Sequence, residues 1–426
     1  MPSSYHHVHT AFVPILDRME ASFESLRNRA VRTGQVLRGD GRGWTLAVVA
    51  AGWLTVLGGR YLFPAILPQV KDFFGVSNAT AGLAVTTVWA AYAVMQFPAG
   101  MLTDRFGERA LLATSLALSA GAVVAVSLAP TFWLFLVGCA LFGLGTGLYG
   151  PARGTALSKV FGEHDGTAIG LTLAAGSIGS ALLPFAASVL VGPLGWQTTV
   201  ALLVVPFLVI AVSVRRVLPR RTPTASPSGR PSVRGLLRAL DTAISRHTVV
   251  AVSAATLTLF VMQGVTSFLP TYFIAVKGFS QERAAALFAL FFLSGALAQS
   301  VAGNAADYYG DRSVLLTTAG FGVLPLLALP FVEGLVPVGV LTVLLGSRLA
   351  LNPVSNAYII AVVPNAVQGT AWGFFRTTFF LLAATGSTVV GLFFDAGLAD
   401  ESFVVLAALT ALAAVCYVFL PARTSV

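Results

Sequence analysis

The chain of 426 residues is 56% hydrophobic and only 10% charged, with a mean hydropathy of +0.83 and a net charge of +9. A soluble domain needs charged residues over roughly 25–35% of its surface, so these figures exclude a soluble globular protein, and they exclude disordered and collagen-like chains as well. Both cysteines, Cys139 and Cys416, lie in apolar runs, which argues against a disulfide framework or a metal cluster. The composition indicates an integral membrane protein, for which we expect no cofactor and no metal.

The first 43 residues form a basic segment without the uninterrupted apolar core of a signal peptide. Its apolar residues recur at helical spacing beside arginines, which predicts an amphipathic helix on the inner membrane surface; a disordered basic tail is the alternative. Either Met1 or Met19 is the true start. The apolar positions are Phe12, Leu16, Met19, Phe23 and Leu26.

Twelve apolar windows follow, each long enough for the ~20 residues that a helix needs to cross a bilayer. The predicted fold is all-α, with an N-terminal six-helix bundle at 44–217, a linker at 218–246, a C-terminal six-helix bundle at 247–421 and a tail at 422–426. The Pro/Ser/Arg-rich linker has too few apolar residues to fold. The expected spans are 44–69, 79–101, 109–129, 131–155, 167–191, 198–217, 247–275, 284–305, 313–333, 337–360, 368–394 and 402–421.

The basic residues are distributed unevenly between the two predicted faces. Of the 26 lysines and arginines, nineteen fall in the terminal segments, the linker and the loops on their side, three in loops on the opposite side, and four inside spans. Cytoplasmic loops carry the excess of Lys and Arg, so we expect both termini and the linker to be cytoplasmic in a multi-pass protein of the cell (plasma) membrane. The positive net charge is then explained by the excess of basic residues on the cytoplasmic side of the membrane, and no nucleic-acid partner is expected.

The two halves share an internal repeat at an offset of 203 residues. The octapeptide GMLTDRFG at residues 100–107 aligns with GNAADYYG at 303–310. Because each copy contains six helices, the copies point the same way, and we expect a pseudo-two-fold axis along the membrane normal with a cavity between the halves. Two further matches keep the offset: Gly166 with Gly369, and Ser77 with Ser280.

With this architecture, residues 100–109 resemble the signature loop between helices two and three of the major facilitator superfamily. The resemblance covers the chain from Trp44 to Pro421. It implies two six-helix bundles that give a solute access to each side of the membrane in turn.

The resemblance also implies that this loop is a gating motif on the cytoplasmic side. There Asp104 would face the start of helix eleven, near Gln368 to Thr370, and stabilise the outward-open state; a carboxylate that only caps its own loop is the alternative. Glu108 and Tyr308 stand where the family pattern has basic residues, so the role is better supported in the first copy. The gating positions are Gly100, Asp104, Arg105, Gly107, Arg109, Gly303, Asp307 and Gly310.

Four arginines lie inside predicted spans, whereas no carboxylate falls near the middle of one. An arginine at the bilayer centre costs ~2.5–3.5 kcal/mol on insertion scales and is expected to face a cavity and carry function. Guanidinium groups suit carboxylate, phosphate or sulfate through two parallel hydrogen bonds, so the four predict an anion site; a structural or gating role is the alternative for each. They are Arg60, Arg153, Arg348 and Arg376.

Polar side chains in neighbouring spans are candidates to complete the substrate site. For each of them a hydrogen bond between helices is the alternative role. The candidates are Tyr92, Gln96, Gln263, Asn352 and Asn356.

We therefore expect a secondary transporter, not an enzyme, that moves a small anion such as a carboxylate. Importing one negative charge costs ~2.3 kcal/mol per 100 mV, so uptake needs a proton or a counter-solute; exchange, efflux and proton-linked symport are the alternatives. A neutral or drug-like solute is a second reading, although the helix-four arginine and Gly-Pro motif typical of drug/proton antiporters are missing. A non-transporting receptor and a membrane-embedded enzyme are remote readings. The expected partners are the solute and the lipid bilayer, and the chain is expected to be a monomer.

Overall fold

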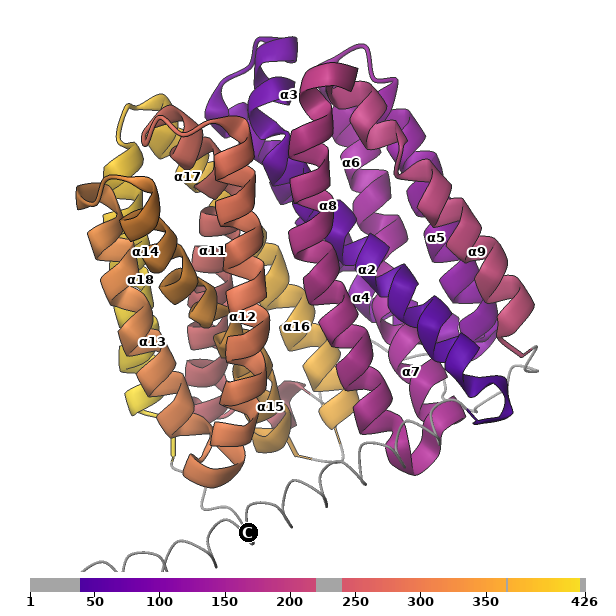
Figure 1. Ribbon diagram of the computed structural model, residues 1–426. Helices are drawn as coiled ribbons and strands as arrows, with labels where there is room; N and C mark the ends of the chain where they lie inside the picture. The colour runs from indigo at the N-terminus through magenta and orange to yellow at the C-terminus, as the bar shows by residue number, and fades with distance from the viewer. Residues whose placement is uncertain (1–38, 220–239, 365–366, 422–426) are drawn as a thin grey trace, which may run out of the picture.

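The computed structural model describes residues 39–219, 240–364 and 367–421, and all regular secondary structure in these ranges is helical. Two bundles stand side by side, one on each side of the linker (Figure 1). The first contains η1 (Gly39–Gly41), α2 (Arg42–Ala65), α3 (Leu67–Phe74), α4 (Asn78–Phe106), α5 (Glu108–Ser127), α6 (Phe132–Gly147), α7 (Tyr149–Phe161), η2 (Gly162–His164), α8 (Asp165–Ala201) and α9 (Val204–Val217). The second contains α11 (Arg246–Ala275), α12 (Gln281–Tyr309), α13 (Asp311–Ala328), η3 (Leu329–Phe331), α14 (Leu335–Gly346), η4 (Ser347–Ala350), α15 (Leu351–Val362), α16 (Gln368–Ala384), α17 (Gly386–Asp395) and α18 (Ala399–Val418).

The described residues contain eleven helical stretches that are long and apolar enough to cross a membrane. One of them, Asp165–Val217, has 53 residues, which at ~1.5 Å per residue is about 80 Å and far exceeds the ~30 Å of a bilayer core. Gly195, with φ 74° and ψ 160°, breaks the helical conformation inside it, and α8 and α9 run as separate rods in Figure 1. The expected all-α arrangement of twelve crossings is confirmed.

Four of the expected spans are interrupted rather than straight. The breaks fall at Ile66, between α2 and α3; at Leu148, between α6 and α7; in η4, between α14 and α15; and at Thr385, between α16 and α17. Irregular backbone at membrane depth is tolerated only where protein buries it or where it lines water. These four spans carry one of the four arginines each; a fifth expected span, 198–217, carries none of them and is also interrupted, at Leu202 and Leu203 between α8 and α9.

The internal repeat extends to individual hydrogen bonds. Ser77 and Ser280 are both N-caps, accepting from Thr80 N and Arg283 N. The turn glycines at 107 and 310 have φ of 79° and 80°, a left-handed region that glycine enters without strain. At the same offset of 203, the Nη2 atom of Arg109 donates to Arg215 O and that of Arg312 to Val418 O. The two bundles are therefore structural copies in the register that the sequence predicted.

Close helix packing inside the first bundle depends on glycine. A Cβ atom added at Gly179 of α8 would lie 2.2 Å from Leu54 O of α2, and one at Gly58 of α2 would lie 2.4 Å from Gly179 O. Small residues allow such backbone contact between helices in membranes. The pair fixes α2 against α8 and so holds the helix that carries Arg60.

We expect Gly179→Ala to destabilise the protein, because the added methyl group meets backbone that cannot move aside; overpacking of this kind costs ~1–3 kcal/mol. The matched control is Gly170→Ala on the same helix, where nothing lies within 4 Å of the added atom. Thermal unfolding in detergent measures both. Equal melting temperatures for the two variants would contradict this packing.

Most of the described hydrogen bonds between the two bundles lie toward one end of the molecule, although Thr377 Oγ1 donates to Ala93 O nearer the middle of α4. We call the end that carries α3 the far end, and the end where α9 leads into the linker the linker end (Figure 1). Gln281 Nε2 donates to Ala65 O at 3.4 Å, and Gln69 Nε2 donates to Gln281 Oε1 at 3.2 Å. Further along, Thr86 Oγ1 donates to Ala384 O at 2.8 Å. The bundles are thus joined near the far end.

Asp395, the last residue of α17, caps the first turn of α4 in the other bundle. Its Oδ1 accepts from Asn78 N at 2.7 Å and from Asn78 Nδ2 at 2.9 Å, and its Oδ2 accepts from Ala79 N at 2.8 Å. Beside it, a Cβ atom at Gly391 would lie 2.6 Å from Asn78 O, and one at Gly82 would lie 2.8 Å from Ser387 O. A charged cap and backbone contact close the far end together.

The predicted N-terminal amphipathic helix, most of the linker and the whole tail lie outside the described residues.

Candidate functional site

Three of the four arginines converge where the two bundles meet: Arg60 on α2, Arg153 on α7 and Arg376 on α16. The guanidinium carbons of Arg60 and Arg153 lie 5.5 Å and 4.2 Å from the ring centroid of Trp53. All three charges are close enough for each pair to repel electrostatically. Two arginines from one bundle and one from the other therefore form a single cationic cluster, which we call the arginine cluster.

Arg60 is the buried member of the cluster, with 1% of its surface exposed. Its guanidinium carbon lies 4.0 Å from the ring centroid of Tyr92 and 5.1 Å from that of Trp89. Its Nε and Nη2 atoms have no hydrogen-bond partner in the described structure. Aromatic faces attract a desolvated cation by ~2 kcal/mol, but they do not satisfy its N–H donors, so the group retains unused hydrogen-bonding capacity.

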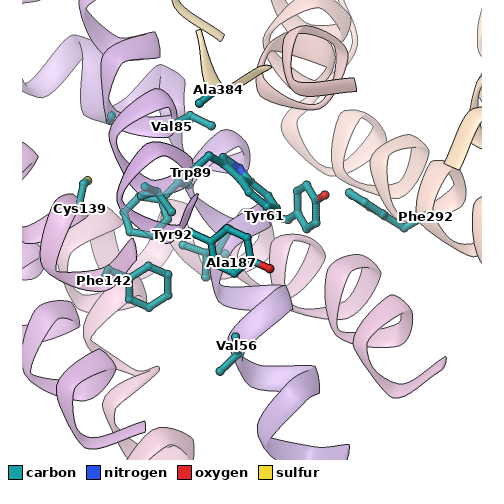
Figure 2. Close-up of a cluster of buried hydrophobic side chains, with 14 of the residues drawn as sticks. Val56, Tyr61, Val85, Trp89, Tyr92, Cys139, Phe142, Ala187, Phe292 and Ala384 are labelled. Atoms are coloured by element: carbon teal, nitrogen blue, oxygen red, sulfur yellow. The ribbon is translucent and has the colours of Figure 1, made fainter. Parts of the chain in front are cut away.

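The aromatic side chains around Arg60 also reach the opposite bundle. Figure 2 shows Tyr61 between Trp89 and Phe292, and the ring centroids of Tyr61 and Phe292 are 4.5 Å apart. Tyr92 packs edge-on against Phe380 of α16 at 5.5 Å and interacts electrostatically with Arg60 and Arg376. Tyr92 is therefore placed to connect the arginines of the two bundles.

The cluster has no acidic partner in the described part of the chain. The salt bridge seen there, Lys159–Glu108 at 2.5 Å, lies at the linker end. Arg153 Nε and Nη1 and Arg376 Nε lack hydrogen-bond partners, while both side chains are partly exposed. Within the described ranges no group of His, Cys, Asp or Glu is arranged to hold a metal. The cluster can bind an anion, because its positive charge has no acidic partner among the described residues and several of its N–H donors lack hydrogen-bond partners. Arg153 and Arg376 are also partly exposed.

The structure does not bring Arg348 to the cluster. It lies in η4 with 4% of its surface exposed, and its Nη1 donates to Gly322 O of α13 at 3.4 Å. A Cβ atom at Gly322 would lie 2.8 Å from Nη1, so this glycine makes room for the guanidinium, whose charge also interacts with Tyr417. Arg348 therefore connects helices inside the second bundle, the structural role that the sequence left open as an alternative. We leave it out of the site.

The polar candidates have different surroundings. Gln96 Nε2 donates to Gly147 O at 3.3 Å within the first bundle, the interhelical role. Gln263 is 3% exposed, and its Nε2 has no partner in the described structure. Asn356 Nδ2 donates to Asn352 Oδ1 at 3.1 Å, while Asn356 Oδ1 is buried without a partner. Gln263 and Asn356 thus retain free hydrogen-bonding capacity.

The motif loop at the linker end is held by a glycine turn and by a bond within its own bundle. Gly107 makes its turn, and Arg109 holds it to α9 through Arg215 O. Asp104 and Arg105 are exposed, and no hydrogen-bond partner of Asp104 is found among the described residues. In the second copy Gly303 and Asp307 are exposed, and Gly310 makes the turn. The side chains of residues 369 and 370, near which the contact from Asp104 was expected, lie outside the described part of the structure, and the gating role of Asp104 stays a prediction.

Sequence reasoning missed three kinds of functional residue. Glu108, treated as a departure from the family pattern, is 6% exposed and pairs with Lys159. Trp53 and Trp89 place their rings against the arginines. The available signal was the presence of tryptophan in a span that contains a buried arginine or lies next to one. Asp395 lies at the end of an apolar run, and only the contact across the two bundles reveals its capping role.

This geometry agrees with the family comparison. The family model described as Major Facilitator Superfamily matches residues 48–347 and 281–426. The chain belongs to the major facilitator superfamily, and it is a membrane transporter of that class.

The relatives that this chain resembles differ in the solutes that their names state. The chain is 30% identical over 300 residues to the probable nitrate/nitrite transporter NarK2 of Mycobacterium tuberculosis, covering 65% of this chain and 70% of the relative. It is 25% identical to the fosmidomycin resistance protein of Escherichia coli, covering 78% and 82%. It is also 25% identical to the uncharacterized MFS-type transporter YfnC of Bacillus subtilis, covering 82% and 86%.

Solved structures agree on the fold alone. A bacterial homolog to the human lysosomal transporter Spinster, in an inward-facing and unoccupied conformation, matches with a TM-score of 0.74 and 16% identity, covering 89% of this chain and 96% of that one. The nucleoside transporter NupG matches with a TM-score of 0.75 and 13% identity, covering 88% and 98%.

Proposed function

We propose that the protein is a secondary transporter of a small organic or inorganic anion, which binds between the bundles at Arg60, Arg153 and Arg376. The arginine cluster carries the proposal: three guanidinium groups from both bundles meet with free donors and with no carboxylate of the described chain paired to them. Uncompensated charge in a low-dielectric site is costly. An anionic ligand supplies the missing partner. The name of the nitrate/nitrite relative supports this class of substrate.

We place both termini and the linker in the cytoplasm of a cell membrane, because nineteen of the 26 basic residues fall on that face in the sequence. The far end is then extracellular. Because most of the described hydrogen bonds between the bundles lie toward that end, the structure corresponds to an inward-facing state in this orientation.

Energetics constrain the transport cycle. Each net negative charge moved inward against the membrane potential costs ~2.3 kcal/mol per 100 mV. The cluster lacks a carboxylate to carry a coupling proton, so anion exchange, efflux, or symport with a proton carried on the substrate fits best. The transporter acts as a monomer with the solute and the bilayer as partners.

One observation favours a second candidate. The guanidinium of Arg60 is enclosed by Trp53, Trp89 and Tyr92, and that arrangement also suits an arginine that only supports helix packing. A neutral or drug-like solute would then occupy the site.

A ligand panel distinguishes the two candidates. The purified protein is heated with nitrate, phosphate, carboxylates, fosmidomycin, neutral sugars or cationic drugs. We expect an anion to raise the melting temperature, since a ligand at about 100 times its dissociation constant adds ~2.7 kcal/mol to the folded state. Arg376→Ala should reduce that stabilisation by about half or more, because a tenfold larger dissociation constant leaves the ligand at only about ten times that constant. Stabilisation by sugars or cationic drugs, unchanged in this variant, would reject the anion proposal in favour of the second candidate.

A further inference from the structure

The repeat register pairs the N-terminal arginines of the cluster with amides in the other bundle. At the offset of 203 residues, Gln263 of α11 occupies the position of Arg60, and Asn356 of α15 occupies that of Arg153. The same offset relates two hydrogen bonds elsewhere in the structure, the donations from Arg109 and Arg312. Positions related by a pseudo-two-fold axis have equivalent relations to that axis. Gln263 and Asn356 are therefore the counterparts of two arginines that converge at the meeting of the bundles.

Gln263 lies on the face of α11 that meets α17, the helix that continues the same span after α16, which carries Arg376. One turn further along, Ser267 Oγ lies 2.6 Å from Ser387 Oγ of α17, and residues four apart share a helix face. The side chain of Gln263 is 97% buried, and its Nε2 has no hydrogen-bond partner in the described structure. A buried amide donor without a partner is rare and costly, which points to a ligand as its partner.

Asn356 supplies the complementary chemistry. Its Nδ2 is occupied by Asn352 Oδ1, which leaves its Oδ1 as a free acceptor. The neighbouring residue Ser355 lies 2.8 Å from the Tyr417 hydroxyl inside the bundle, so the two asparagines, a turn apart, occupy a different face of α15. A free donor and a free acceptor thus stand where the first bundle has two guanidinium groups.

We propose that the substrate is a hydroxylated organic acid, with its carboxylate held by the arginine cluster and its hydroxyl groups held by Gln263 and Asn356. A hydroxyl group both donates and accepts, so it satisfies either amide in either orientation. A purely apolar tail would leave both amides unsatisfied. The inference rests on the proposed anion function and names its substrate class.

Matched acids of equal charge and chain length test the inference. Isothermal titration of the purified full chain compares butyrate with threonate and hexanoate with gluconate. We expect the hydroxylated acid of each pair to bind at least about tenfold more tightly, because a site built for hydroxyl groups rejects the analogue without them. In Gln263→Leu and Asn356→Leu that preference should fall to less than about threefold while the affinity for butyrate is kept.

The control is Thr256→Val on α11, since Thr256 Oγ1 already donates to Val252 O at 2.8 Å in its own helix; this variant should keep the preference. Equal affinity for butyrate and threonate would overturn the inference, as would a preference that survives both leucine variants. Failure of every carboxylate and of nitrate to bind would instead reject the anion function itself.

Discussion

We expect Arg376→Ala and Arg153→Ala each to reduce anion affinity by more than tenfold, and Arg348→Ala to leave the affinity of the folded protein unchanged. The first two variants remove partly exposed side chains of the cluster whose buried N–H donors lack partners, and a hydrogen bond to a charged group contributes ~1.5–3 kcal/mol. Arg348 is equally charged and also embedded, but its Nη1 is engaged with Gly322 O. Titration of purified variants with the anion found in the ligand panel measures the three affinities.

Arg348→Ala also serves as a stability control for this comparison. Loss of its packing in the second bundle should lower the melting temperature without changing the dissociation constant. Weaker anion binding in Arg348→Ala, together with unchanged binding in Arg376→Ala, would reverse our assignment of the site.

We expect Asp395→Asn to shift the protein toward the state that is open at the far end. The substitution removes the charge that two backbone N–H groups and the positive end of α4 stabilise. Charge-assisted bonds of this kind contribute ~1.5–3 kcal/mol, so the ratio of the two states should change by about tenfold or more. Accessibility of single cysteines placed at the far end and at the linker end, measured in membranes, reports the ratio.

The matched control is Asp400→Asn, whose carboxylate accepts from the Tyr272 hydroxyl at 2.5 Å within the second bundle and should not shift the ratio. The predicted role of Asp104 has the opposite sign, since it would stabilise closure at the linker end. Labelling of Asp395→Asn that matches the unsubstituted protein at both ends would show that the cap is incidental.

The span count and the repeat could be predicted because bilayer thickness and turn chemistry are local constraints on sequence. Apolar windows of the required length recur twelve times, and Gly107 and Gly310 mark equivalent turns. The interruptions could not be placed in this way. Leu148 and Thr385, for example, are ordinary residues in apolar runs, and tertiary packing decides where those helices bend.

Arg348 could not be separated from the cluster by its sequence surroundings. The helix that precedes it, α14, is apolar on every side, so no periodicity indicates which way the following arginine faces. The other arginines converge through contacts between helices distant in sequence, such as the shared ring of Trp53. The repeat register, by contrast, is a property of the sequence, and the offset of 203 residues applied to Arg60 leads directly to Gln263.

The contact of Gly82 and Gly391 with backbone of the opposite bundle bears on how fast the far end can open. Because the crossing is formed by main chain, separating α4 from α17 withdraws few long side chains from a packed pocket. Ordering a long side chain on closure costs up to ~2 kcal/mol of conformational entropy, and glycine carries none. Opening at this crossing therefore breaks mainly a few hydrogen bonds, which water can replace, so the glycine contact itself adds little to the barrier.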